Sequence, residues 1–293
     1  MELNPSKKLK KISGKEYTKR YQLLSLIFLR NNIFISLCSV FFFISGSLLI
    51  NPNYPGILSS SLIFWSTLLI YQINTKIKFN FLSLKSYKKL DFKSNKSLKF
   101  VLIIALILLF HIPFMNFKSI ICLSFLGLIS TLYNVPEKSN INSLLPLRSV
   151  PILKVFLIAF VWAFMSSFLP AISESPDIYT LKNTQVFIGH LFFITAITLP
   201  FDIRDLKKDN HSLIITIPQL IGVRFTKIFA IILLMLFYLV MIPFLNPIYL
   251  FIFILITMGL ILFSSTKKQD YYYTLFIDGT IILYFFTVIL SLE

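Results

Sequence analysis

Long apolar runs recur along the whole sequence, and they restrict the possible folds more than any other feature. Each run is roughly 20 residues long, the length that a helix needs to cross a bilayer core. The chain of 293 residues is 56% hydrophobic and 14% charged, whereas soluble domains contain about 25% charged residues. The runs do not alternate apolar and polar residues, as the strands of a membrane barrel do. The sequence therefore predicts an all-α, polytopic integral membrane protein.

Nine runs can be placed, and they are separated by turns rich in Pro, Asn or Lys. They cover approximately 32–50, 56–74, 100–114 with a break near Pro113, 117–133, 151–170, 184–201, 225–244, 247–264 and 272–291. Residues 1–31 begin with many lysines and end in an amphipathic segment, which predicts a basic cytoplasmic tail and an interfacial helix on anionic lipid. We therefore divide the chain into this tail and a nine-helix transmembrane domain, 32–293.

The formal net charge of +16 raises the question of a nucleic-acid partner. With the N-terminus inside, 26 of the 28 Lys and Arg residues lie in segments that face the cytoplasm, and only Lys118 and Lys182 lie outside. Such a bias sets membrane orientation. It predicts a protein of the cell (inner) membrane with a cytoplasmic N-terminus and a C-terminus on the opposite side. Because no nucleic-acid-binding motif accompanies the charge, we expect no nucleic-acid partner.

One acidic stretch follows the sixth run. Asp202, Asp205 and Asp209 are spaced three and four residues apart, which places them on one face of a helix. Three neighbouring carboxylates repel one another unless a cation lies between them, and Mg²⁺ is commonly bound by a few carboxylates together with substrate phosphates. The stretch therefore predicts a Mg²⁺–diphosphate site at the cytoplasmic membrane surface. The alternative is a solvated loop in which Arg204 and the two following lysines neutralise the acids.

Three segments carry a resemblance to a known family. The stretch Asp202-Ile-Arg-Asp205-Leu-Lys-Lys-Asp209 matches the pattern D-x-x-D-x-x-x-D, and 216–222 reads T-I-P-Q-L-I-G. After the fourth run, the sequence contains Y-N-x-P at 133–136 and L-R-x-x-P-x-L-K at 147–154. Together with the nine runs, these segments resemble the UbiA-type intramembrane prenyltransferase superfamily, whose second aspartate-rich motif has the first pattern.

The resemblance implies a ring of nine helices around a cavity open to lipid, in which Mg²⁺ holds a prenyl diphosphate and the prenyl group passes to a lipophilic acceptor. It makes the three aspartates both catalytic and metal-binding. It also implies that five further residues bind the substrate: Asn74, Tyr133, Asn134, Arg148 and Lys154. We add Arg204, within the second motif, to these substrate-binding candidates. Arg148 and Lys154 could instead anchor the chain at the inner surface of the membrane, and Tyr133 could be an ordinary interfacial tyrosine.

The first aspartate-rich motif of the family, N-D-x-x-D-x-x-x-D, is missing from its place after the second run. If Asn74 is the motif's asparagine, Thr75, Lys78 and Leu82 stand at the three aspartate positions. All three carboxylates of this half of the site are therefore absent, and one is replaced by a cation.

Two hypotheses follow from the cation at position 78. In the first, Lys78 binds the diphosphate directly while Mg²⁺ stays on the aspartates of the second motif, so prenyl transfer persists in altered form. In the second, Lys78 pairs with Asp205 or Asp209 and replaces the metal. The protein is then a catalytically inactive relative that binds a lipid or quinone or partners other membrane proteins.

A few polar residues lie inside or beside the apolar runs. Asp278 falls within the ninth run, where a charge costs about 2.5–3.5 kcal/mol on insertion scales, so we expect it to face the bundle interior. It is a candidate substrate-binding residue, or it ties two helices together. Cys38 and Cys122 are predicted to be core residues. The histidines form no ligand cluster, and His111 and His190 are expected at or near helix ends.

Overall fold

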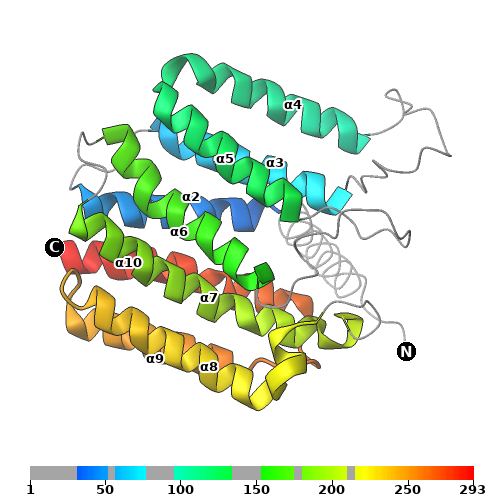
Figure 1. Ribbon diagram of the computed structural model, residues 1–293, viewed down its shortest axis with the longest axis vertical. Coiled ribbons are helices and arrows are strands. Elements are labelled where there is room, and N and C mark those ends of the chain that lie inside the picture. The colour runs from blue at the N-terminus through cyan, green and yellow to red at the C-terminus, as the bar shows by residue number, and fades with distance from the viewer. Residues whose placement is uncertain (1–31, 52–56, 77–95, 134–152, 175–179, 210–214) are drawn as a thin grey trace, which may run out of the picture.

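The protein is helical throughout the part of the chain that the structure describes (Figure 1). The structure is a computed structural model, and it describes residues 32–51, 57–76, 96–133, 153–174, 180–209 and 215–293. These ranges contain no strand, which confirms the all-α prediction. The helices are α2 (Ile33–Ile50), α3 (Ile57–Lys76), α4 (Lys96–His111), α5 (Phe117–Tyr133), α6 (Leu153–Glu174), α7 (Leu181–Asp209), α8 (Ile217–Met241), α9 (Pro247–Leu262) and α10 (Gly279–Leu292), with a 3₁₀ turn η1 (Ile112–Phe114) and a π-helical turn η3 (Tyr272–Ile277).

The helices differ in whether they are long and apolar enough to cross a membrane. Five segments are: Ile33–Ile50, Leu153–Ile172, Leu181–Leu206, Ile217–Met241 and Tyr272–Leu292. Four apolar helices are shorter: Ile57–Ile73, Lys99–Phe114, Phe117–Thr131 and Pro247–Leu262. The helices therefore support an integral membrane protein, whereas nine full crossings remain a prediction. The predicted tail, 1–31, lies outside the described residues.

Several helix ends follow from local sequence. The predicted break near Pro113 is confirmed, because α4 ends at His111 and η1 follows. At the start of α9, Pro247 occupies the first helical position, and the Asn246 side chain accepts a hydrogen bond from the Ile248 N–H at 3.0 Å. Proline fits this position because the first N–H groups of a helix have no partner within the helix.

Helix α7, which contains the sixth apolar run, is longer than predicted. Its apolar run was expected to end near 201, with a loop over 202–227, but α7 continues to Asp209 and α8 begins at Ile217. The difference arises because hydrophobicity marks only the apolar part of a helix. Beyond the apolar part, Lys154 of α6 neutralises Asp202, and α7 continues through the acidic stretch to Asp209.

The backbones of α2 and α6 touch where they cross. A Cβ atom added at Gly46 would lie 1.7 Å from the carbonyl oxygen of Ser166. Only glycine permits this approach, as is common where membrane helices pack closely. The contact fixes α2 against α6, and α6 and α2 in turn pack against α7 and α10 respectively.

Two predictions about buried residues have different outcomes. Cys38 and Cys122 are buried, as expected. His190 does not lie at a helix end; it lies well inside α7 and is fully buried. Sequence reasoning misplaced it because the start of α7 is polar and was assigned to a loop.

His190 belongs to a polar chain that joins three helices in the core. Its Nδ1 lies 2.7 Å from the Ser166 hydroxyl on α6, and its Nε2 lies 3.0 Å from the Tyr284 hydroxyl on α10. Ser166 also donates to the carbonyl oxygen of Ala163 at 3.1 Å. Buried polar groups need partners to offset desolvation, and the two partners of the His190 ring come from two different helices.

Candidate functional site

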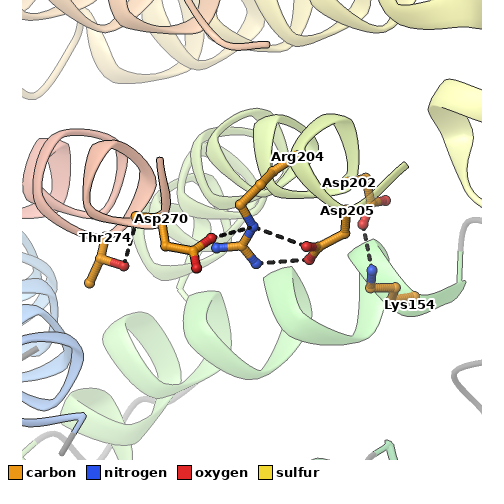
Figure 2. Close-up of polar contacts among 6 residues, drawn as sticks. All are labelled: Lys154, Asp202, Arg204, Asp205, Asp270 and Thr274. Atoms are coloured by element: carbon orange, nitrogen blue, oxygen red, sulfur yellow. Dashed lines mark hydrogen bonds and ion pairs between the residues drawn. The ribbon is translucent and has the colours of Figure 1, made fainter. Parts of the chain in front are cut away.

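The acidic end of α7 carries the first of two ion pairs. Asp202 is buried, with 1% of its surface exposed. Its Oδ1 lies 2.5 Å from Nζ of Lys154, which projects from the start of α6 (Figure 2). The lysine side chain is 15% exposed. A buried carboxylate needs such a counter-charge, so the first turn of α6 and the last turns of α7 are held together here.

The second pair involves adjacent residues on α7. Arg204 donates from Nε to Asp205 Oδ1 at 3.1 Å and from Nη2 to Oδ2 at 2.8 Å. This two-pronged geometry is the favoured one between a guanidinium and a carboxylate. Asp270, in the turn between α9 and η3, lies on the other side of the same guanidinium, 3.8 Å from Nε (Figure 2).

Aromatic rings fix the position of Arg204. Its guanidinium carbon lies 5.1 Å from the ring centre of Phe201 and 5.4 Å from that of Tyr273 in η3. The Tyr273 hydroxyl donates to the carbonyl oxygen of Ser265 at 2.7 Å and accepts from the Ser265 N–H at 3.0 Å. The cation is therefore held between α7 and the corner that leads into α10.

Asp278 lies where η3 gives way to α10. It is partly buried, and its backbone carbonyl accepts a hydrogen bond from the Cys38 thiol of α2 at 3.5 Å. Its carboxylate forms no hydrogen bond with the residues that the structure describes, although the charge of Arg204 acts on it. The residue thus lies within range of the charge of Arg204, a neighbour that its position inside the ninth run did not predict.

The remaining predicted site residues are described only in part or not at all. Asn74, Tyr133 and Asp209 belong to α3, α5 and α7, but their side chains are outside the described set. Lys78, Asn134 and Arg148 lie outside the described residues. Neither hypothesis about Lys78 is therefore tested. The structure brings Lys154 next to Asp202, and Arg204 next to Asp205.

Sequence reasoning missed three contacts in this cluster. It did not pair Lys154 with Asp202, and it did not consider Asp270 or Tyr273. A signal existed for one of them, since Asp270 is the only acidic residue in the basic turn 267–270. For Tyr273, nothing in the local sequence indicates a stack against an arginine about 70 residues away.

The side chains at the end of α7 provide the type of ligand atom, carboxylate oxygen, that Mg²⁺ binds. Asp202 and Asp205 are one turn apart on α7 and supply carboxylate oxygens, and Mg²⁺ needs only one or two carboxylates when a diphosphate supplies further ligands. No group of three His, Cys, Asp or Glu side chains lies close enough to hold a metal within the described ranges. Each carboxylate is instead neutralised by a cation of the chain itself.

Comparison with known proteins gives matches by structure alone. No family model matches the sequence, and no curated protein matches it. The fold matches a structure of digeranylgeranylglyceryl phosphate synthase, with a TM-score of 0.55 and 18% identity over 94% of this chain and 98% of that one. It also matches the apo structure of a UbiA homologue from Aeropyrum pernix K1, with a TM-score of 0.61 and 11% identity over 89% of this chain and 99% of that one.

A third match is a UbiA homologue from Archaeoglobus fulgidus in a structure with GPP and Mg²⁺. Its TM-score is 0.54, with 15% identity over 90% of this chain and 98% of that one. All three matches cover nearly the full length of both proteins. The chain therefore has the fold of the UbiA-type prenyltransferases.

Proposed function

We propose that this protein transfers a prenyl group from a prenyl diphosphate to a lipophilic acceptor, in an altered form of UbiA-type chemistry. The observation that carries the proposal is the pair of carboxylate–cation contacts at the end of α7, Asp202 with Lys154 and Asp205 with Arg204. Two carboxylates for a metal and two cations for phosphate oxygens stand together in a fold whose Archaeoglobus representative has been determined with GPP and Mg²⁺.

The four side chains act by exchanging partners when substrate binds. Mg²⁺, held by Asp202 and Asp205, would supply charge neutralisation for the departing diphosphate. Lys154 and Arg204, released from the carboxylates, then donate to the diphosphate oxygens. The exchange replaces each ion pair by another, so no buried charge is left without a counter-charge. Aspartate 209 is proposed as a third carboxylate, one turn further along α7.

The missing first motif alters the opposite side of the site. Lys78 stands where the family has an aspartate, and we assign it to the diphosphate together with Asn74, Tyr133, Asn134 and Arg148. Cations in place of carboxylates favour a site with fewer metal ions, in which charge on the leaving group is neutralised by the chain. Asp278, beside Arg204, is proposed to contact the acceptor.

A second candidate is a catalytically inactive relative that binds a lipid or quinone or partners other membrane proteins. One observation favours it: Asp202 and Asp205 are already neutralised by Lys154 and Arg204, so the fold does not require a metal at this end of α7. The two candidates differ in whether Mg²⁺ and a prenyl diphosphate can displace the cations.

Binding of geranyl diphosphate to the purified protein in lipid nanodiscs distinguishes the candidates. Titration is done with Mg²⁺ or with a chelator, on wild type, Asp202→Asn and Asp205→Asn. The matched control is Asp270→Asn, whose exposed carboxylate touches only the edge of the cluster. We expect Mg²⁺-dependent binding that each α7 variant weakens about tenfold or more and the control leaves unchanged. Absence of Mg²⁺-dependent binding in wild type would support the inactive relative.

We also propose that the protein resides in the cell (inner) membrane, with the N-terminus in the cytoplasm and the C-terminus on the other side. The distribution of lysine and arginine supports this orientation. Labelling of single cysteines with a membrane-impermeant reagent tests it. A cysteine after Glu293 is expected to react in intact cells, and one before Lys7 only after lysis.

A further inference from the structure

A polar pocket and an apolar cavity adjoin one another at the α3–α4–α5 side of the bundle. The pocket, about 300 Å³, lies where α3 begins and α4 ends, with Ser59, His111, Asn116 and Ser119 on its polar side. The cavity, about 660 Å³, lies between α3, α4, α5 and α6. Leu62 and Met115 line both, so the two spaces are neighbours. Each volume is in the range of small-molecule sites, roughly 300–1,000 Å³.

The pocket offers hydrogen bonds but no fixed charge. His111 Nδ1 lies 2.7 Å from the carbonyl oxygen of Ile107 and must therefore donate, and in the neutral ring Nε2 then accepts from the Ser61 hydroxyl at 3.1 Å. Asn116 donates one amide hydrogen to the Ile172 carbonyl at 3.2 Å, and its second has no partner among the described residues. None of the described lining residues is Lys, Arg, Asp or Glu. The pocket thus suits a neutral polar group.

The cavity suits a hydrocarbon chain. It extends from Ile112 and Met115, beside the pocket, to Ile73 and Thr131 near the opposite ends of α3 and α5. Its walls are mostly branched aliphatic side chains, with Trp162 contributed by α6. An apolar space that stays empty loses dispersion contacts along its lining, so a chain of matching polarity stabilises it.

The order of the two spaces along the helices matches a molecule embedded in a bilayer. Phe114 and Phe117, which are 61% and 75% exposed, flank the pocket at the junction of α4 and α5. The cavity runs away from this junction along the apolar helices. A ligand with its head in the pocket and its chain in the cavity therefore has the orientation of a lipid.

We propose that the pocket and the cavity form one site for a single-chain amphiphile from the bilayer, with a neutral hydrogen-bonding head such as a long-chain alcohol, phenol or quinone. The pocket proposed for the head lies where α4 ends and α5 begins, and this junction is at the end of the bundle opposite to the C-terminal end of α7 (Figure 1). The proposal does not rest on the diphosphate chemistry at Asp202 and Asp205.

Tryptophan fluorescence tests the proposal, because the chain has only two tryptophans. Trp162 lines the cavity and Trp65 does not, so the Trp65→Phe variant reports on the cavity alone. The full-length protein is titrated in phospholipid vesicles with a long-chain alcohol brominated at mid-chain, and separately with the alkyl phosphate of the same chain. We expect saturable quenching by the alcohol and about tenfold weaker binding of the phosphate, whose charge finds no counter-ion in the pocket.

Two glycines provide a matched pair of variants in this background. A Cβ atom at Gly127, which lines the cavity, or at Gly259, on α9 outside it, meets no atom within 4 Å. Gly127→Leu fills the cavity and is expected to weaken binding about tenfold, while Gly259→Leu changes it less than about twofold. Thermal unfolding checks that both variants fold. Non-saturable quenching, equal affinity for the phosphate, or equal effects of the two variants would overturn the proposal.

Discussion

The packing around α7 and the packing of α3, α4 and α5 differ sharply. Along α7, side chains such as Phe193, Leu199 and Ile203 are completely enclosed. On α4, Ile104 is the one buried hydrophobic residue among those described, and Leu106 and Phe110 are 65% and 67% exposed. The first region has a filled interior, whereas the second surrounds a cavity of about 660 Å³.

The difference matches two kinds of chemistry. Ion pairs such as Lys154–Asp202 function only when their helices are held in fixed positions, because a misplaced buried charge is costly. A hydrocarbon chain requires volume and little precision. The tightly packed helices therefore carry the ion-paired carboxylates of the proposed diphosphate site, and the loosely packed helices carry the proposed lipid site. Four predictions test this contrast through protein stability.

The largest effect is expected where α2 and α6 touch. Gly46→Ala places a methyl group 1.7 Å from the Ser166 carbonyl oxygen and is expected to lower the free energy of unfolding by about 3 kcal/mol or more. Gly127→Ala meets no atom within 4 Å and is expected to be neutral or to stabilise by up to about 1 kcal/mol. Thermal unfolding in detergent measures both. Similar losses in the two variants would remove the contrast between the regions.

The next effect concerns the counter-ion of Asp202. Lys154→Met keeps most of the aliphatic side chain but leaves a buried carboxylate without its partner, and we expect a loss of about 2–3 kcal/mol. The double variant Lys154→Met with Asp202→Asn removes the uncompensated charge and should recover most of this loss. If the double variant is as unstable as the single one, the ion pair does not stabilise the α6–α7 contact.

A smaller effect is expected in the polar chain of the core. Tyr284→Phe leaves His190 Nε2 without its partner in a dry interior, at a loss of about 1–2 kcal/mol. Ser61→Ala does the same to His111 Nε2, but beside a pocket of about 300 Å³ that can admit water. For Ser61→Ala we therefore expect the free energy of unfolding to fall by less than about 0.5 kcal/mol. Equal losses measured by chemical unfolding would show that the two histidines have equivalent surroundings.

The smallest effect is expected at Asp270. Its side chain is 79% exposed and lies 3.8 Å from Arg204, so Asp270→Asn should change the free energy of unfolding by less than about 0.5 kcal/mol. A loss above about 1 kcal/mol in the same unfolding experiment would mean that Asp270, and not Asp205, is the main partner of the guanidinium.

Features that depend on neighbouring residues could be predicted from the sequence. The apolar runs located all nine helices of the described chain, and the proline at 113 gave the break after α4. The spacing of Asp202 and Asp205 correctly placed them one turn apart on a helix. Each of these follows from hydrophobicity or backbone constraints acting over a few residues.

Features that depend on helix packing could not be predicted. Lys154 and Asp202 are 48 residues apart, and they meet only because α6 lies along α7. His190 appeared unremarkable in the sequence, since its partners Ser166 and Tyr284 come from two other helices. The cavity beside Trp162 is likewise a property of four helices together, and hydrophobicity does not distinguish a residue that lines a cavity from one in a filled core.

The central claim is that the end of α7 binds and activates a prenyl diphosphate. The most direct measurement is the release of diphosphate from geranyl diphosphate by the full-length protein in vesicles of native membrane lipid, with Mg²⁺ or with a chelator. We predict Mg²⁺-dependent release that Asp202→Asn reduces about 100-fold or more and Asp270→Asn leaves unchanged. Release that is independent of Mg²⁺, or equally fast in Asp202→Asn, would contradict the claim.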